Sequence, residues 1–210
     1  MKPLSSFDVI VVGAGAAGCV VARRSAASGR RTLLVEAGSA VGTEAITGLE
    51  ALAALEEPGW LWPDVAAEVS GGSEVSYRQG RGLGGGSAVN SLVLSPGDRR
   101  DYDRWGEAAS GEAWGWGSMA PWIAHVDAVL RPEPASLGPF AEAFRSVAVA
   151  AGHADGGGSA RIDAVGYLTA QLAVRAGRRN SVADAYGLTT PDRPHEALVV
   201  RTRSTVDRLV

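Results

Sequence analysis

The feature that most constrains the fold is a short apolar run that leads directly into a glycine-rich loop. Residues 8–12 read Asp-Val-Ile-Val-Val, and residues 13–18 read Gly-Ala-Gly-Ala-Ala-Gly. The run suits a buried parallel strand, and the Ala- and Val-rich residues 16–28 suit a helix that stops at Gly29. Residues 32–35 form a second buried apolar run. Residues 7–36 therefore predict a compact β-α-β unit.

This unit has the features with which proteins bind the pyrophosphate of a dinucleotide. Gly13 allows a tight turn, Gly15 removes a side chain that would block the phosphates, and Gly18 lets helix and strand pack closely. The N-terminus of the helix offers N–H groups, and the Glu36 carboxylate can accept hydrogen bonds from a ribose diol. The predicted cofactor-binding residues here are Gly13, Gly15, Ala16, Ala17, Gly18, Glu36 and Ala37.

A second glycine-rich loop lies about seventy residues further along the chain. Residues 80–90 read Gly-Arg-Gly-Leu-Gly-Gly-Gly-Ser-Ala-Val-Asn. Successive small residues let a loop present backbone N–H groups to an anion, and Arg81 adds positive charge. We expect residues 84–87 to meet the pyrophosphate from the side opposite to the first loop. The first loop alone does not distinguish FAD from NAD.

The second loop resembles the first signature of the glucose-methanol-choline (GMC) oxidoreductase family, which binds FAD. Its positions are filled by Gly80, Arg81, Leu83, Gly84, Gly85, Gly86, Ser87, Val89 and Asn90, with Gly97 and Asp103 at the later positions. Leu94 departs from the signature, where the family prefers an aromatic residue or Ala. The resemblance continues through residues 101–105, 114–116, 120–122, 177–186, 193–194 and 199–209.

The resemblance implies an α/β fold, with a Rossmann-like FAD-binding domain around a parallel sheet. That domain is expected to be incomplete, with residues 1–130 as its first part and 196–210 as its truncated return strand. Residues 131–195 are expected to begin a substrate-domain insertion. The resemblance places Asn90 and its neighbours beside the flavin ring, and the Val206 backbone at the adenine. The cofactor-binding residues predicted here are Arg81, Gly84, Gly85, Gly86, Ser87, Asn90, Ser91 and Val206.

The activity that the resemblance implies is the oxidation of an alcohol CH–OH group, with a histidine as general base and the flavin as hydride acceptor. His125, His153 and His195 do not match the family's catalytic histidine, and no pair has metal-ligand spacing. We therefore expect neither catalytic nor metal-binding residues in this chain, which alone should be inactive. Features of residues 36–81, 95–98 and 120–122 resemble the branch associated with the redox cofactor mycofactocin. The electron acceptor is then mycofactocin or an electron-transfer chain.

Three explanations of the missing half remain open. The chain is a truncated piece of a longer oxidoreductase, one subunit of a split enzyme completed in trans, or a non-catalytic FAD-binding module. The abrupt end after residues 205–210 favours truncation. An NAD-dependent dehydrogenase is a further alternative, against which the second loop argues.

Composition excludes some partners and suggests a compartment. The net charge of −3 gives no basic field, so nucleic acid is not an expected partner. Cys19 is the single cysteine, which rules out an internal disulfide and fits the cytoplasm. No signal peptide or membrane span is predicted.

Further elements follow from local patterns. Helices are predicted over residues 49–57, 101–109, 118–130, 139–151 and from 180 or 181 to 186, with Ser118 as an N-cap. Residues 197–202 predict a strand. Without later strands the sheet would keep an unpaired apolar edge, so the isolated chain is expected to aggregate or to seek a partner.

Overall fold

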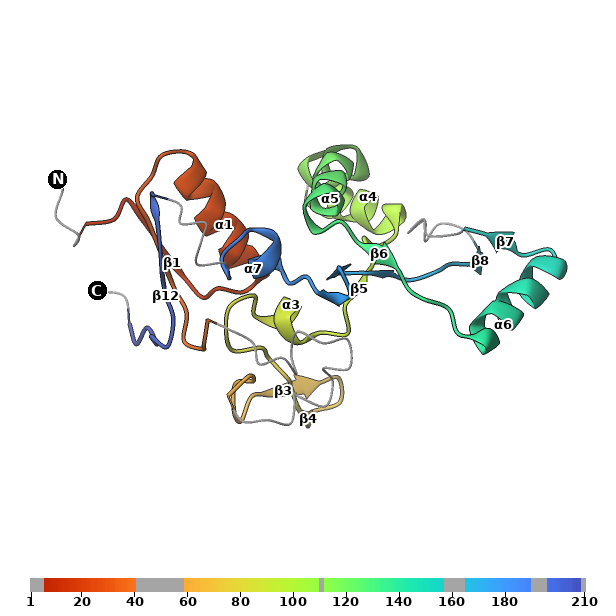
Figure 1. Ribbon diagram of the computed structural model, residues 1–210, viewed down its shortest axis with the longest axis horizontal. Helices are drawn as coiled ribbons and strands as arrows, with labels where there is room; N and C mark the ends of the chain where they lie inside the picture. Colours follow the sequence, from red (N-terminus) through yellow and green to blue (C-terminus); the bar gives the residue numbers. More distant parts are fainter. Residues whose placement is uncertain (1–5, 41–58, 110–111, 157–164, 190–195, 209–210) are drawn as a thin grey trace. The chain divides into compact units, whose positions relative to one another are not determined.

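The computed structural model describes residues 6–40, 59–109, 112–156, 165–189 and 196–208 (Figure 1). The chain divides into two compact units. Unit 1 combines residues 1–91 with residues 176–210, and unit 2 comprises residues 92–175. Unit 1 is therefore assembled from the two ends of the sequence. The predicted domain boundaries at residues 130 and 195 stay a prediction. Helices α4 (Arg99–Ala108) and α5 (Trp116–Leu130) pack against each other within unit 2.

A three-stranded parallel sheet lies at the centre of unit 1. Its strands are β1 (Val9–Val12), β2 (Thr32–Val35) and β12 (Leu198–Arg201). Strand β2 lies in the middle, with Thr32 paired to Val9 on one side and to Leu198 on the other. The predicted parallel β-α-β unit and the predicted return strand are both confirmed.

Helix α1 (Ala16–Ala27) covers one face of this sheet (Figure 1). The core contains Cys19 and Ala22 from α1 and Leu34 from β2, all fully buried. A Cβ atom on Gly18 would lie only 1.9 Å from the Gly13 carbonyl oxygen. A glycine at position 18 is therefore required for the helix to pack this closely on the turn.

The other face of the sheet is largely uncovered within the part of the chain that the structure describes. Alternate residues of a strand point to opposite faces, and Val11, Leu34 and Val200 face the core. Their neighbours Ile10 and Val199 are 61% and 38% exposed. The sheet thus presents an apolar surface on the side away from α1.

Two short helices and a hairpin complete the described part of unit 1. These are α3 (Gly86–Val89), α7 (Val182–Ala185) and the antiparallel strands β3 (Ala66–Val69) and β4 (Ser73–Ser76), with strand β11 (Arg178–Arg179) before α7. Ser181 caps α7: its hydroxyl accepts from the Asp184 N–H, and the Asp184 carboxylate accepts from the Ser181 N–H. The prediction of a helix capped by residue 181 is confirmed.

Unit 2 combines helices with short strands. Its helices are α4 (Arg99–Ala108), the 3-10 turn η2 (Glu112–Trp114), α5 (Trp116–Leu130) and α6 (Pro139–Ala150). Strands β5 (Val93–Leu94), β9 (Gln171–Leu172) and β6 (Glu133–Pro134) form one antiparallel sheet. Strands β7 (Ala154–Asp155) and β8 (Gly166–Tyr167) pair in parallel, and β10 is Val174–Arg175.

Most predicted helices of unit 2 are present, but the proposed cap of α5 is wrong. The helix begins at Trp116 with Gly115 as N-cap, so Ser118 lies inside its first turn. The Asp103 carboxylate accepts a hydrogen bond from the Trp116 N–H at 3.0 Å, which satisfies one of the donors that a capping side chain would serve. The helix predicted over residues 49–57 lies outside the described residues. No described helix is long and apolar enough to span a membrane.

Candidate cofactor-binding site

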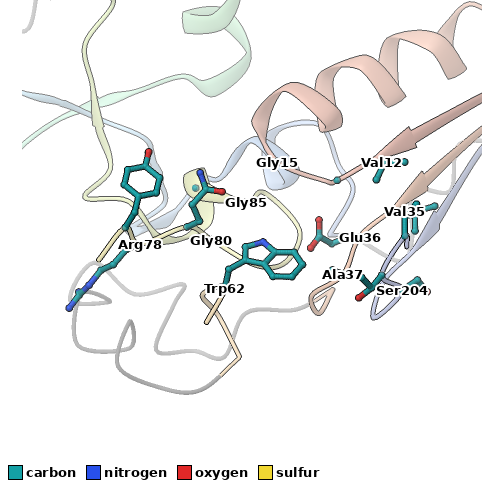
Figure 2. A pocket seen from close by; sticks show the side chains of 16 residues that line it. Val12, Gly15, Val35, Glu36, Ala37, Trp62, Arg78, Gly80, Gly85 and Ser204 are labelled. Atoms are coloured by element: carbon teal, nitrogen blue, oxygen red, sulfur yellow. The ribbon is translucent and has the colours of Figure 1, made fainter. Parts of the chain in front are cut away.

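A pocket of about 440 Å³ opens at the carboxyl end of the unit 1 sheet (Figure 2). It lies where β1 leads into the first glycine loop and where β2 ends at Glu36. Ligands of open parallel sheets bind at this edge, because the loops and helix N-termini converge there. The predicted residues that line the pocket are Gly13, Gly15, Glu36, Ala37, Gly85, Gly86 and Val206.

Glu36 is the one acidic residue of the described pocket lining. It is only 6% exposed. One carboxylate oxygen accepts a hydrogen bond from the Ala14 N–H at 2.7 Å, and the other accepts from the Gly38 N–H at 2.8 Å. Each oxygen keeps a second lone pair, so the carboxylate can still accept from a ligand hydroxyl. Glu36 therefore organises the first loop while it faces the pocket.

The two glycine loops are in direct contact. The Gly84 N–H donates to the Ala14 carbonyl at 2.8 Å. Gly85 has a φ of +51°, and a Cβ atom on it would lie 2.7 Å from the Gly15 Cα. Only glycine combines this backbone conformation with so close an approach. The contact places Gly15 and Gly85 together in the pocket lining.

Three backbone donors of the second loop are used within the two loops themselves. The N–H groups of Gly84, Gly85 and Ser87 donate to the carbonyl oxygens of Ala14, Gly82 and Gly84, respectively. These donors hold the loop to the first loop and to itself, so they are not available to a pyrophosphate in this conformation. The predicted contact of residues 84–87 with the pyrophosphate stays a prediction, and three of the four N–H groups already have an acceptor within the two loops.

The first turn of α1 supplies the remaining donors. The first N–H groups of a helix have no acceptor within that helix. Gly15 is the N-cap of α1, and no side chain caps this end. Ala16, Ala17 and Gly18 form the first turn behind Gly15 and are not part of the pocket lining itself. The positive end of the α1 dipole thus lies at Gly15.

The shape of the pocket fits the pyrophosphate of a dinucleotide. A Cβ atom built on Gly15 or on Gly86 would meet no atom within 4 Å, although both residues line the pocket. These two glycines leave open space next to backbone N–H groups, where any side chain would intrude. The Glu36 carboxylate lies in the same lining, where it can accept hydrogen bonds from a ribose. The residues present therefore fit a dinucleotide such as FAD.

Arg81 does not line this pocket. It borders a separate small cavity, and its guanidinium carbon lies 5.2 Å from the centre of the Trp62 ring. Its Nε atom is buried without a hydrogen-bond partner in the described structure. The indole of Trp62 lines the pocket and points toward the side where Glu36 lies (Figure 2). The Arg81 side chain stacks on Trp62, and its expected role as a charge at the pyrophosphate stays a prediction.

Ser87, Asn90 and Ser91 also lie outside the pocket lining. The Ser87 hydroxyl donates to the Gly84 carbonyl at 2.7 Å and accepts from the Val182 N–H at 3.1 Å. The Asn90 Oδ1 accepts a hydrogen bond from Arg179 Nη1 at 3.0 Å. The side chains of Ser87 and Asn90 thus connect the second loop to the segment that returns from unit 2. Their predicted roles at the cofactor stay predictions.

Several residues of the pocket were not predicted from the sequence. They are Val12, Val35, Trp62, Tyr77, Arg78, Gln79, Gly80, Ser204 and Thr205. Residues 77–79 follow strand β4, whose exposed residues carry no apolar pattern. Ser204 and Thr205 adjoin Val206, and the Ser204 N–H donates to the Glu36 carbonyl at 2.9 Å. This bond explains how Val206, predicted to meet the adenine, comes to line the same pocket as Glu36.

Two buried groups near the loops have shifted pKa values. Burial raises the pKa of the Cys19 thiol to about 11. Burial also lowers the pKa of the Arg179 guanidinium, and the charge of Asp184 partly opposes this shift. Among the described residues, no group of three or more His, Cys, Asp or Glu side chains is arranged to hold a metal ion.

Comparison with known proteins identifies relatives over almost the whole chain. A family model described as GMC oxidoreductase matches residues 7–210. The 5-(hydroxymethyl)furfural oxidase of Methylovorus sp. (strain MP688) is 40% identical over 130 residues, covering 56% of this chain and 24% of the relative. The alcohol dehydrogenase [acceptor] of Pseudomonas putida is 36% identical over 114 residues, covering 52% of this chain and 20% of the relative.

A solved structure has the same fold. The crystal structure of pyridoxine 4-oxidase from Mesorbium loti superposes with a TM-score of 0.77 at 25% sequence identity. The match covers 94% of this chain and 42% of the pyridoxine oxidase chain. The chain therefore spans less than half of the length of each of these relatives.

Proposed function

The chain belongs to the GMC oxidoreductase family, and from this premise we propose that it supplies the FAD-binding part of an enzyme that oxidises an alcohol. The cofactor is FAD. When bound, FAD supplies the redox chemistry by taking a hydride from the alcohol carbon. This chain's residues bind and orient that cofactor. The observation that carries the proposal is the single pocket wall built from both glycine loops and Glu36.

We assign three tasks to the residues of this wall. Gly15 and Gly86 admit the pyrophosphate next to the N-terminus of α1. Glu36 accepts hydrogen bonds from the ribose of the adenosine. Val206 contacts the adenine through its backbone. All three tasks concern binding, and none of them moves a proton of the substrate.

We propose that the general base lies outside this sequence. A base must reach the alcohol hydroxyl within hydrogen-bond distance. His125 and His153 belong to unit 2, and no histidine is among the described residues that line the pocket. His195 lies outside the described residues. The remaining half of the enzyme is supplied in the same longer chain or by a second chain.

Support for an alcohol substrate comes from the relatives. Their names describe an oxidase of a hydroxymethyl compound and an alcohol dehydrogenase. The acceptor that reoxidises the flavin stays a prediction, with mycofactocin or an electron-transfer chain as candidates. A non-catalytic FAD-binding subunit is the second candidate function, which the absence of a histidine from the described pocket lining favours.

The test is a two-stage flavin experiment. The chain is first titrated with FAD, and flavin fluorescence reports the bound fraction. Primary alcohols are then added without oxygen, first to the chain alone and then together with a separately produced C-terminal half from a family member. The proposal expects FAD binding throughout and bleaching of the flavin only when the second half is present. Bleaching by the chain alone would show that the base is already here, and no FAD binding in either setting would refute the proposal.

A further inference from the structure

A buried arginine donates hydrogen bonds to the second glycine loop, and it was not identified from the sequence. Arg179 lies on strand β11 and is only 7% exposed. Its Nη1 atom donates to the Asn90 Oδ1 at 3.0 Å and to the Ser87 carbonyl at 3.3 Å. Ser87 and Asn90 lie at the two ends of helix α3. One guanidinium nitrogen therefore bridges both ends of this helix.

The side of α3 that Arg179 holds is distinct from the side that faces the pocket. Gly86, the first residue of α3, lines the pocket, whereas Ser87, Asn90 and Arg179 do not. The bond from the Val182 N–H to the Ser87 hydroxyl reinforces the same attachment. Arg179 and Val182 thus hold the second loop although neither residue lines the pocket.

The position of this attachment along the chain gives it a further meaning. The chain leaves unit 1 after Ser91, one residue beyond Asn90, and returns at Ala176, three residues before Arg179. The bond between Arg179 and Asn90 therefore joins the segment by which the chain leaves unit 1 to the segment by which it returns. A charged side chain is costly to bury, and two oriented acceptors from the loop offset part of that cost.

We infer that Arg179 is a positioning residue for FAD binding, which acts by fixing the second glycine loop against the first. It is not among the residues that line the pocket. Its replacement should let α3 shift, so that Gly85 and Gly86 no longer form a wall opposite Gly15. The inference rests on the proposed function, because the pocket is taken as the FAD site.

The experiment compares Arg179→Met with Arg178→Met. Arg178 is the adjacent residue and is exposed, so its replacement is a matched control. In the full chain, Arg179→Met should weaken FAD binding by about 10- to 100-fold, which corresponds to the loss of charge-assisted hydrogen bonds. Arg178→Met should leave FAD binding within about twofold of the wild type. Arg179→Lys keeps the positive charge but replaces the planar guanidinium with a compact ammonium group. Its FAD affinity should lie between those of the two methionine variants.

Three readouts separate positioning from a general loss of stability. Visible circular dichroism of the bound flavin should change for Arg179→Met, because the cofactor sits against a displaced loop. Millimolar guanidinium should restore FAD affinity to Arg179→Ala but should have no effect on Arg178→Ala. A lower melting temperature of Arg179→Met together with unchanged FAD affinity and spectrum of the folded fraction would overturn the inference.

A final measurement remains informative even if the wild-type chain binds no FAD, which would refute the proposed function. Hydrogen exchange of residues 82–90 should be faster in Arg179→Met than in Arg178→Met, with β1 and β2 unchanged. Equal exchange in the two variants would show that Arg179 does not fix the loop.

Discussion

At the scale of single residues, Glu36 has two tasks, and one substitution should impair both. Its carboxylate accepts the N–H groups of Ala14 and Gly38 and also faces the pocket. In Glu36→Gln an amide NH2 would replace one of these acceptors, which leaves a buried N–H group without a partner. We expect a loss of about 1–3 kcal/mol in the free energy of unfolding and at least about tenfold weaker FAD binding.

Urea unfolding with and without FAD measures both effects. Glu68→Gln on the exposed strand β3 is the control and should change neither quantity. A Glu36→Gln chain that is as stable as the wild type would show that the two backbone bonds contribute nothing.

Replacing two glycines of the first loop with alanine should have different effects: one replacement should weaken FAD binding and the other should lower stability. Gly15 has an ordinary φ of −65° and open space around an added Cβ, so Gly15→Ala should unfold normally but bind FAD poorly. Gly18 would place a Cβ atom 1.9 Å from the Gly13 carbonyl, so Gly18→Ala should lose stability. The loss for position 18 should be about 1–3 kcal/mol or more. Thermal melting and FAD titration of both variants check this, and the same response in both would contradict it.

The Cys19 thiol should be unreactive in the folded chain. It is fully buried, its Sγ donates to the Ala14 carbonyl at 3.2 Å, and its pKa is raised from 9.0 to about 11. A raised pKa favours the protonated thiol in the folded state, so this contribution to stability is complete below pH 9 and is lost as the pH rises toward 11. Reaction with Ellman's reagent at pH 8 should be slow in buffer and fast in urea. Rapid reaction without urea would refute burial of the thiol.

At the scale of elements, the capping box of α7 offers a clean test of the returning segment. Ser181→Ala removes the acceptor for the Asp184 N–H and should cost about 1 kcal/mol of stability. Because Val182 of the same helix donates to Ser87, the second loop should also become less protected from hydrogen exchange. Ser73→Ala, on the exposed strand β4, is the matched control. Equal melting temperatures for the two variants would exclude a contribution of the cap.

Elements with a strong local pattern could be predicted, and those without one could not. The apolar runs of β1 and β2 and the glycine loop between them specify a β-α-β unit whose strands pair as expected. Strands β3 and β4 read Ala-Ala-Glu-Val and Ser-Glu-Val-Ser and have little buried surface, so no alternation revealed them.

The site shows the same division. Gly13, Gly15 and Glu36 line the pocket. Their positions could be predicted because they belong to one contiguous β-α-β motif whose backbone places them. The positions of Arg81 and Asn90 depend on distant partners: Trp62 for the first residue and Arg179 for the second. Sequence spacing carries no information about such contacts.

At the scale of the whole molecule, the face of the unit 1 sheet that the described residues leave uncovered should govern solubility. Exposed apolar surface of this kind promotes association. The double variant Ile10→Thr and Val199→Thr keeps β-branched side chains but makes this face polar. We expect less light scattering from the isolated chain and a melting temperature within about 2 °C of the wild type. Val11→Thr, on the face that packs against the core, should instead lower the melting temperature. Unchanged scattering of the double variant would locate the association surface elsewhere.

The middle strand of unit 1 has consequences for the order in which the chain folds. Strand β2 pairs on one side with β1, which precedes it closely, and on the other side with β12, which comes from the far end of the sequence. Unit 2, in contrast, is one continuous segment. During synthesis on a ribosome, unit 2 has all its residues before the third strand of unit 1 emerges. The sheet that carries the pocket is therefore incomplete until the segment between β2 and β12 has been synthesised. A delay at this stage leaves one edge of β2 unpaired and open to pairing with other nascent chains.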